Sequence, residues 1–324
     1  IKPANYDQHL EELRNCDLLI EAIAERPDWK AELYERITPY LNERAILATN
    51  TSGLRINMLA ESVPDALRSR FCGIHFFNPP RYMALVELIP CQQTDPAILD
   101  QLETFLVTTL GKSVVRAKDT PNFIANRIGV FSMAATIHHT AAFGLSLDLV
   151  DALTGPAIGR PKSATYRTAD VVGLDTMGHV FKGSALALQH DPWRAYFTPP
   201  VWLTTLIEQG ALGQKTGTGI YAAKGKQVLN PETGEYQNAG AKPSEAVQAI
   251  LKIRNPAEKF AALRASADPQ AQFLWAIHRD AFHYSAVLLA EIADTARDVD
   301  LAIRGGFGWS MGPFEIWQAA GWKQ

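Results

Sequence analysis

The chain has 324 residues, of which 47% are hydrophobic and 20% charged, a balance that excludes disordered, collagen-like and low-complexity proteins. Its 31 Lys and Arg against 34 Asp and Glu give a net charge of −3, so no basic excess is available to bind nucleic acid. No apolar run approaches the roughly 18–20 residues of a membrane span, and three scattered cysteines are too few for a disulfide framework or a zinc site, which favours a cytoplasmic protein without a metal.

The first 119 residues alternate short apolar runs with amphipathic segments. We expect strands at 17–24, 45–48, 70–77, 84–90 and 113–117, and helices at 28–41, 56–61 and 95–111. Strands that alternate with helices predict a doubly wound α/β sheet. In the last of these helices, Asp95 and Pro96 suit the cap and first turn, and Gly111 suits the C-terminal stop.

After Pro121 the pattern becomes helical. One long apolar helix is expected at 123–143 and shorter helices at 202–209 and 260–265, with no strand among them. Residues 225–243 are polar and contain several Gly, Asn and Pro, which predicts a surface linker.

The last part of the chain repeats features of the first helical part. Asp151 precedes Gly159 by eight positions, and Asp300 precedes Gly308 by the same eight. Since helical domains share such spacings by chance, a true repeat and a coincidence are equally open on this pattern alone. The predicted domains are an α/β domain at 1–119, a helical domain at 120–222, and a linker with a second, incomplete helical domain at 223–324.

The most informative segment surrounds His75. An apolar strand carries His75 and ends in Asn78-Pro-Pro, which forces a turn. Glu87 lies twelve residues later in the next apolar strand, where a carboxylate is costly unless it is paired. A histidine oriented by a carboxylate is a general acid/base pair. On these two residues alone, a structural core histidine and a separate surface glutamate are the alternative.

Two further polar features follow or lie within predicted elements. Residues 48–53 (ATNTSG) follow a strand at the edge where open α/β sheets bind ligands, so their side chains either contact a ligand or cap the helix near Ile56. Asn126 lies on the long apolar helix, where it makes either a core hydrogen bond or a substrate contact. Residues 217–222 fit G-x-G-x-x-A but follow no strand, so we reject them as a dinucleotide loop.

Taken together, these segments resemble the L-3-hydroxyacyl-CoA dehydrogenases of fatty-acid β-oxidation. The matching segments occur in family order, at 20–25, 48–52, 73–79, 85–87, 119–127, 173–175 and 213–221. Residues 308–315 resemble the family's helical-domain motif a second time, which supports a repeat and a multifunctional β-oxidation protein. The resemblance implies an α/β fold, with a partial Rossmann-like doubly wound sheet followed by two helical units of the dehydrogenase C-terminal type.

The resemblance also implies an activity, the NAD-dependent oxidation of (S)-3-hydroxyacyl-CoA to 3-oxoacyl-CoA. His75 would be the general base for the 3-hydroxyl proton, oriented by Glu87, while Ser52 and Asn126 would hydrogen-bond the reacting oxygen or the adjacent acyl group. The residues expected to line the NAD site are Glu25, Lys30, Ser52, Asn78 and Lys215. The implied partners are an acyl-CoA thioester and a fused or associated enoyl-CoA hydratase and thiolase, and 120–222 would bind substrate or form a dimer.

Two features depart from the family pattern. The glycine-rich phosphate loop and the acidic residue for the ribose have no counterpart here, which would weaken cofactor binding. Residues 159–166 replace the usual Met-Gly-Pro-Phe run, which leaves the acyl-chain preference open. The missing loop and a start at Ile1 without Met lead us to expect a chain truncated at both ends. The alternatives are a non-catalytic or acyl-CoA-binding fragment unable to hold NAD, and a dehydrogenase of free hydroxy acids.

Overall fold

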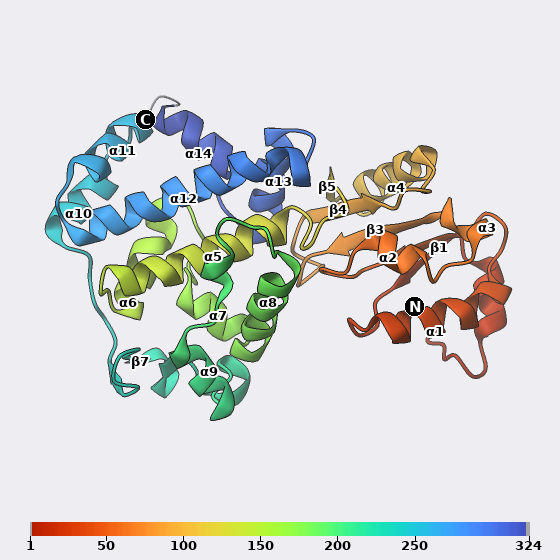
Figure 1. Ribbon diagram of the computed structural model, residues 1–324, viewed down its shortest axis with the longest axis horizontal. Coiled ribbons are helices and arrows are strands. Elements are labelled where there is room, and N and C mark those ends of the chain that lie inside the picture. The colour runs from red at the N-terminus through yellow and green to blue at the C-terminus, as the bar shows by residue number, and fades with distance from the viewer. Residues whose placement is uncertain (1, 322–324) are drawn as a thin grey trace. The chain divides into compact units, whose positions relative to one another are not determined.

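The computed structural model describes residues 2–321, which fold into two compact units (Figure 1). Unit 1 comprises Ile1–Asn126 and Leu289–Gly306, and unit 2 comprises Arg127–Leu288 and Phe307–Gln324. Part of the last of the three segments expected from the sequence, Leu289–Gly306, packs with the α/β domain in unit 1. The predicted domain boundaries stay a prediction.

Unit 1 is built on a five-stranded sheet whose strands lie in chain order. They are β1 (Leu18–Glu21), β2 (Ile46–Thr49), β3 (Phe71–Phe76), β4 (Leu85–Pro90) and β5 (Ser113–Arg116). Neighbouring strands are parallel except β3 and β4, which are antiparallel. Only residues 77–84 join these two strands, and a parallel crossover needs about a dozen residues or more. All five predicted strands and the α/β fold class are confirmed.

Helices cover both faces of this sheet. Unit 1 contains α1 (Pro27–Ile37), α2 (Ile56–Ala60), α3 (Asp65–Arg68), α4 (Pro96–Thr108) and all but the last residue of α13 (Ala296–Phe307), with 3-10 turns at Leu10–Asn15 and Thr38–Tyr40. Helix α4 packs its leucines against Ile74, Val86 and Leu88 on one face. Because strand side chains alternate, the other face carries His75 and Glu87.

The expected ends of α4 are present. The Asp95 carboxylate accepts a hydrogen bond from the Ala97 backbone N–H at 2.9 Å, as a helix cap does. Beyond the last turn, Gly111 adopts a positive φ of 66°, which a residue with a side chain rarely adopts.

Unit 2 is mainly helical. Its helices are α5 (Ala125–Ala142), which begins in unit 1, α6 (Leu147–Thr154), α7 (Tyr166–Val172), α8 (Leu174–Ala187), α9 (Val201–Glu208), α10 (Glu245–Leu251), α11 (Pro256–Ala265), α12 (Pro269–Ile292), which ends in unit 1, and α14 (Pro313–Ala320). Short 3-10 turns lie at Pro156–Ile158, Arg194–Phe197, Gln214–Thr216 and Ala223–Gly225. Helices α5 and α12 pack antiparallel, since Arg127 contacts Tyr284 and His139 contacts Asp280. Among the described residues, no helix is both long and apolar enough to cross a membrane.

Two expectations for unit 2 were wrong. We expected no strand after Pro121 and a surface linker at 225–243, but a small antiparallel sheet of β6 (Tyr221–Ala222), β7 (Gln227–Leu229) and β8 (Tyr236–Asn238) occupies this region. Strands of two or three residues are too short to show an alternating pattern in the sequence. The G-x-G-x-x-A segment, residues 217–222, follows a 3-10 turn and ends in β6, so no strand leads into it and no helix of a βαβ unit follows it, in agreement with its rejection as a dinucleotide loop.

The two halves of the expected repeat share one local geometry. Gly159 has a φ of 75° and Gly308 a φ of 67°, and each follows a buried aspartate by eight residues. Backbone angles of this kind favour glycine. The shared conformation supports a repeated helical unit.

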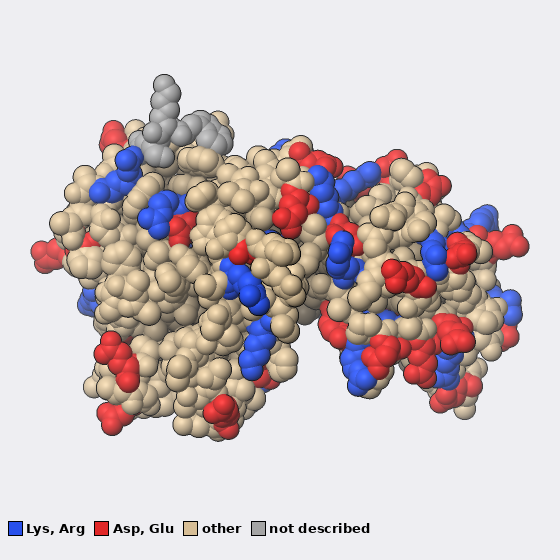
Figure 2. All heavy atoms as spheres, in the orientation of Figure 1, with Lys and Arg blue, Asp and Glu red and all other residues tan. Residues whose placement is uncertain are grey.

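On the face of the molecule shown in Figure 2, charged side chains of both signs are interspersed.

Candidate active site

Strands β3 and β4 bring His75 and Glu87 together. Their antiparallel register pairs the two residues directly, so both side chains lie on the same face of the sheet. The Nδ1 atom of His75 lies 2.7 Å from the Oε2 atom of Glu87, and the two residues are 3% and 0% exposed. The expected contact between them is therefore present.

Glu87 is fixed at both of its oxygens. Its Oε1 atom accepts hydrogen bonds from the backbone N–H groups of Ile124 at 3.1 Å and Ala125 at 2.8 Å. With three donors, the buried carboxylate is fully compensated. The imidazole of His75 lies between the rings of Phe77 and Phe123, at centroid distances of 4.4 Å and 5.6 Å. The Nε2 atom of His75 has no hydrogen-bond partner among residues 2–321.

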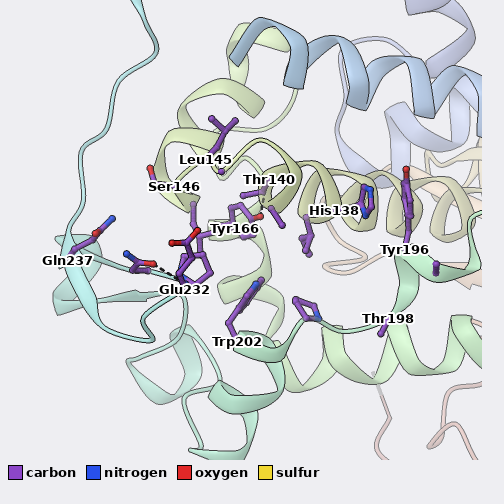
Figure 3. Close-up of a pocket in the computed structure, with 18 residues that line it drawn as sticks. His138, Thr140, Leu145, Ser146, Tyr166, Tyr196, Thr198, Trp202, Glu232 and Gln237 are labelled. Carbon is purple, nitrogen blue, oxygen red and sulfur yellow. Dashed lines mark hydrogen bonds between the residues drawn. The ribbon is translucent and has the colours of Figure 1, made fainter. Parts of the chain in front are cut away.

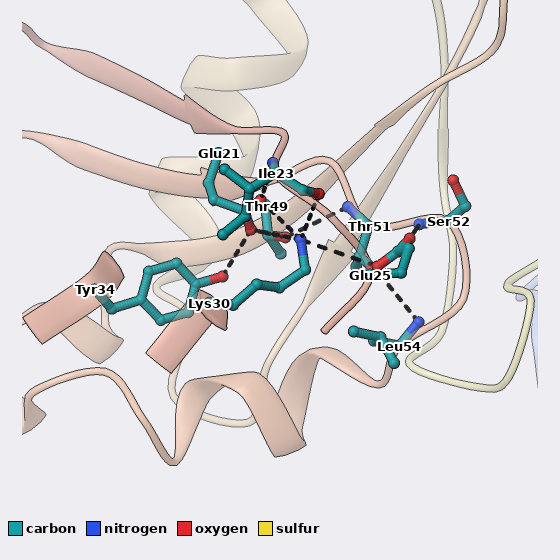
Figure 4. Close-up of polar contacts among 9 residues, drawn as sticks. All are labelled: Glu21, Ile23, Glu25, Lys30, Tyr34, Thr49, Thr51, Ser52 and Leu54. Atoms are coloured by element: carbon teal, nitrogen blue, oxygen red, sulfur yellow. Dashed lines mark hydrogen bonds and ion pairs between the residues drawn. The ribbon is translucent and has the colours of Figure 1, made fainter. Parts of the chain in front are cut away.

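Ser52 lies in the exposed turn that follows β2. The Glu25 carboxylate holds this turn, because it accepts hydrogen bonds from the Ser52 N–H at 2.5 Å and from the Thr51 hydroxyl at 2.8 Å (Figure 4). The Asn126 amide donates to the Ser52 carbonyl at 3.4 Å. The structure thus brings Glu25, Ser52 and Asn126 together, and Asn126 directly follows the residue whose amide binds Glu87.

Lys30 does not face solvent. Its side chain is 1% exposed, and its ammonium lies 2.7 Å and 2.9 Å from the two carboxylate oxygens of Glu21 (Figure 4). It also lies 3.9 Å from the Glu25 carboxylate. In this position the Lys30 ammonium neutralises the Glu21 carboxylate and also lies near the Glu25 carboxylate. A direct contact of Lys30 with the cofactor stays a prediction.

Glu21 is a residue that our sequence reasoning missed. Besides Lys30, it accepts hydrogen bonds from the Tyr34 hydroxyl at 3.0 Å, the Thr49 hydroxyl at 2.7 Å and the Ile23 N–H at 2.7 Å. Burial, followed by the charge of Glu21, raises the pKa of Tyr34, so the phenol stays a donor. An acid in an apolar strand is costly unless it is paired, and that argument, used for Glu87, would have found Glu21 too.

The carboxyl ends of β1, β2 and β3 meet at one edge of the sheet. Asn78, just after β3, is exposed there. The Asn50 side chain, just after β2, accepts a hydrogen bond from the Phe76 N–H of β3 at 2.9 Å and so connects the two strand ends. Glu25 and Ser52 are exposed at the same edge, where open α/β sheets bind ligands. Lys215 belongs to unit 2, where its ammonium lies 2.6 Å from Asp175. Its expected place in the cofactor pocket stays a prediction.

A cavity of about 470 Å³ in unit 2 contains none of these residues (Figure 3). Its lining includes the aromatic side chains of His138, Tyr166, Tyr196 and Trp202. The hydroxyls of Tyr166 and Tyr196 donate to Thr140 and Asp280, so their hydrogens are already used within the protein. In the described part of the chain, no group of three or more His, Cys, Asp or Glu could hold a metal ion.

Comparison with known protein families identifies both parts of the chain. Residues 1–120 match the model described as "3-hydroxyacyl-CoA dehydrogenase, NAD binding domain". Residues 123–223 match the model described as "3-hydroxyacyl-CoA dehydrogenase, C-terminal domain". Together the two matches cover well over half of the chain.

Two curated relatives match almost the whole chain. A probable 3-hydroxyacyl-CoA dehydrogenase of Bacillus subtilis is 40% identical over 326 residues, which cover 100% of this chain and 41% of the relative. A putative fatty acid oxidation complex trifunctional enzyme of Rickettsia felis is 33% identical over 330 residues, or 98% of this chain and 44% of the relative. The chain therefore spans less than half the length of these two relatives.

The solved structure of 3-hydroxybutyryl-CoA dehydrogenase from Escherichia coli shares the fold. It superposes with a TM-score of 0.75 at 20% sequence identity, and the match covers 97% of this chain and 76% of that structure. The similarity includes the last hundred residues, which lie outside both family models.

Proposed function

This chain belongs to the 3-hydroxyacyl-CoA dehydrogenase family, and from that premise we propose that it oxidises (S)-3-hydroxyacyl-CoA to 3-oxoacyl-CoA with NAD. The observation that carries the proposal is the buried contact of His75 with Glu87. A connection between this pair and Ser52 supports the proposal further, because Ala125 binds Glu87 and the next residue, Asn126, binds Ser52.

In this proposal His75 is the general base. Oxidation of a secondary alcohol requires that the hydroxyl proton leave as the hydride departs from the same carbon. With the Nδ1–H of His75 directed at Glu87, the lone pair on Nε2 takes that proton. The Glu87 carboxylate, 2.7 Å away, then stabilises the imidazolium. The C3–H and O–H bonds break, a carbonyl forms at C3, and bound NAD supplies the hydride acceptor.

Ser52 and Asn126 orient the substrate in this scheme. The Ser52 hydroxyl has no hydrogen-bond partner among the described residues and the side chain is exposed, so it is available to the reacting oxygen. The Asn126 amide, held near it by a long 3.4 Å hydrogen bond, has donor capacity left for the acyl carbonyl. Two positioned donors at this point would hold the carbinol against His75.

The residues present suit the nicotinamide side of an NAD site. Glu25, Ser52 and Asn78 are exposed at the carboxyl edge of the sheet, where a cofactor meets a parallel α/β sheet. The described residues contain no G-x-G-x-x-G loop between a strand and a helix, so we assign no pyrophosphate contacts to them. The proposal has two further parts. By analogy with the trifunctional relative, we propose enoyl-CoA hydratase and thiolase activities in the same protein or complex. We also propose a cytoplasmic location.

The test compares a thioester with a free acid. The purified full-length protein is assayed for NADH formation from (S)-3-hydroxybutyryl-CoA, a longer acyl homologue and free 3-hydroxybutyrate, and NAD binding is measured in parallel. Turnover of the thioesters supports the proposal. Turnover of the free acid alone would instead make the protein a hydroxy-acid dehydrogenase, and loss of both NAD binding and turnover would make it a non-catalytic fragment.

A further inference from the structure

Two adjacent glycines lie near the end of helix α13, where it packs on strand β4. Gly305 and Gly306 have helical backbones without positive φ, so conformational freedom is not what requires glycine here. A Cβ atom on Gly305 would lie 3.1 Å from the Cβ of Leu85, and one on Gly306 would lie 2.8 Å from its Cδ2. Glycine weakens a helix relative to alanine, so its presence in a helix indicates a close approach.

The Gly306 position also contacts both neighbours of the His75–Glu87 pair. A Cβ there would lie 3.1 Å from the Phe77 ring and 3.2 Å from the Cβ of Ala125. The Phe77 ring packs on His75 at 4.4 Å, and the Ala125 N–H donates to Glu87 at 2.8 Å. One added methyl group would therefore press on the ring that flanks His75 and on the residue that binds Glu87.

Contacts at the start of helix α13 and its close packing on β4 limit how the helix can adjust to such a methyl group. The segment that leads into it is fixed by Lys118, whose N–H donates to the Ile292 carbonyl at 3.2 Å. The Lys118 ammonium binds the Ala290 carbonyl at 2.9 Å and lies 3.2 Å from Asp294. Next to Gly306, Gly305 already lies close to the backbone of Leu85. The displacement would fall on the side chains of Leu85 and Phe77 and on the start of α5.

We infer that Gly306 is a positioning residue for the His75–Glu87 pair, acting through Phe77 and Ala125. By this inference, helix α13, which the sequence assigned to a separate helical unit, forms the rear wall of the candidate active site within unit 1. The inference rests on the proposed function, in which the pair removes the substrate proton. The inference goes further in one respect: the absence of a side chain at position 306 leaves room for Phe77 and Ala125, which hold His75 and Glu87 in place.

The experiment uses Gly306→Ala in the full-length protein, with Gly183→Ala as the matched control. Gly183 is also helical, on α8, but a Cβ there would have no atom within 4 Å. For Gly306→Ala we expect kcat to fall about tenfold or more, since displacements of about 1 Å at a reacting centre cost up to about 100-fold. The affinity for NAD should change much less than kcat, because the three atoms nearest to the added Cβ belong to Leu85, Phe77 and Ala125 and not to Glu25, Ser52 or Asn78. Gly183→Ala should keep the wild-type kcat.

A second-site change separates positioning from a general loss of folding. Leu85→Val removes the Cδ2 atom that the new methyl group meets first and leaves the contacts with Phe77 and Ala125, so the double variant Leu85→Val/Gly306→Ala should regain part of the kcat of Leu85→Val alone. Amide hydrogen exchange gives a readout that needs no activity. Exchange in the peptide 123–126 should be faster in Gly306→Ala, unchanged in Gly183→Ala and partly restored in the double variant, because it reports the hydrogen bonds to Glu87.

Wild-type kcat together with wild-type exchange in Gly306→Ala would overturn the inference. So would a loss of kcat that Leu85→Val does not relieve while NAD affinity falls in parallel, since that is the pattern of a misfolded protein. If the wild-type protein oxidises no 3-hydroxyacyl-CoA, the proposed function fails. The exchange measurement then still decides whether Gly306 holds the contact of Ala125 with Glu87.

Discussion

The Nδ1 atom of His75 lies 2.7 Å from the Oε2 atom of Glu87, and the other oxygen of Glu87 is held by two backbone N–H groups at the start of α5. The carboxylate is thus fixed from the sheet on one side and from the helix on the other. Because the Nδ1 atom of His75 faces Glu87, the Nε2 atom is the ring nitrogen that is left to accept a proton.

Glu87→Gln should therefore lower kcat by about 10²- to 10⁴-fold, the usual contribution of general acid–base catalysis. A neutral amide cannot stabilise the imidazolium, although it preserves the size of the side chain. Initial rates with (S)-3-hydroxybutyryl-CoA measure the effect. Glu103→Gln, at a half-buried position of α4 where the carboxylate pairs with Arg116, is the control and should keep the wild-type rate. Equal rates in the two variants would contradict the role of Glu87.

Lys30→Met should destabilise the protein by about 3 kcal/mol or more, because it leaves the buried Glu21 carboxylate without its counter-ion. Urea unfolding of the single variant and of Glu21→Gln/Lys30→Met measures this, and the double variant should recover part of the loss, because the neutral amide oxygen can still accept hydrogen bonds from the donors that Glu21 binds. Lys2→Met is the control, since the Lys2–Glu12 pair has the same 2.7 Å distance but is exposed. Its effect on the free energy of unfolding should be far smaller than that of Lys30→Met, because water screens an exposed ion pair. Similar losses in the two lysine variants would refute the argument from burial.

Asp119→Ala should lower the free energy of unfolding by about 1–2 kcal/mol through the loss of a helix cap. The Asp119 carboxylate accepts from the backbone N–H groups of Ile56 at 2.6 Å and Asn57 at 2.8 Å, at the start of α2. Asp119→Asn keeps an acceptor and should lose less. Denaturant unfolding of the two variants tests the ranking, and an equal loss would show that the cap is not the cause.

The stability of the protein should also depend on His278 below neutral pH. Burial lowers the pKa of His278 to about 4, against about 6.5 in an unfolded chain. Between these values the unfolded state binds a proton that the folded state does not, so the stabilisation is complete above about pH 6.5 and is lost as the pH falls towards 4.

The variant His278→Gln removes this titration. The stability of the wild type relative to the variant should therefore fall by about 2 kcal/mol between pH 7 and pH 5. Urea unfolding of both proteins at the two pH values measures the change. Subtracting the variant removes the opposing contribution of Asp151, whose pKa is raised by burial to about 6. The same difference at both pH values would contradict a depressed pKa in the folded state.

Local patterns in the sequence were enough to predict the strands of unit 1, and they offered the pairing of His75 with Glu87 as one of two alternatives, which the family resemblance then favoured. Both depend on features within a few residues, namely buried apolar runs and an acid that needs a partner. The strands β6, β7 and β8 were missed because two or three residues carry no measurable period.

The position of Gly306 could not be predicted from the sequence. Its helix reads as part of a distant helical unit, and its contact with Leu85 arises only from the packing of segments far apart in the chain. The ion pair of Lys30 with Glu21 was not predicted, because Glu21, nine residues earlier in the chain, was not considered as its partner, and a contact of Lys30 with the cofactor stays a prediction. Contacts of this kind are set by the folded arrangement rather than by local spacing.

The most direct test of the central claim is kcat for (S)-3-hydroxybutyryl-CoA oxidation in His75→Gln, measured together with NAD affinity. We expect kcat to fall by at least about 10²-fold while the affinity for NAD stays unchanged, because His75 moves a proton and does not hold the cofactor. A variant that forms NADH at the wild-type rate would contradict the account.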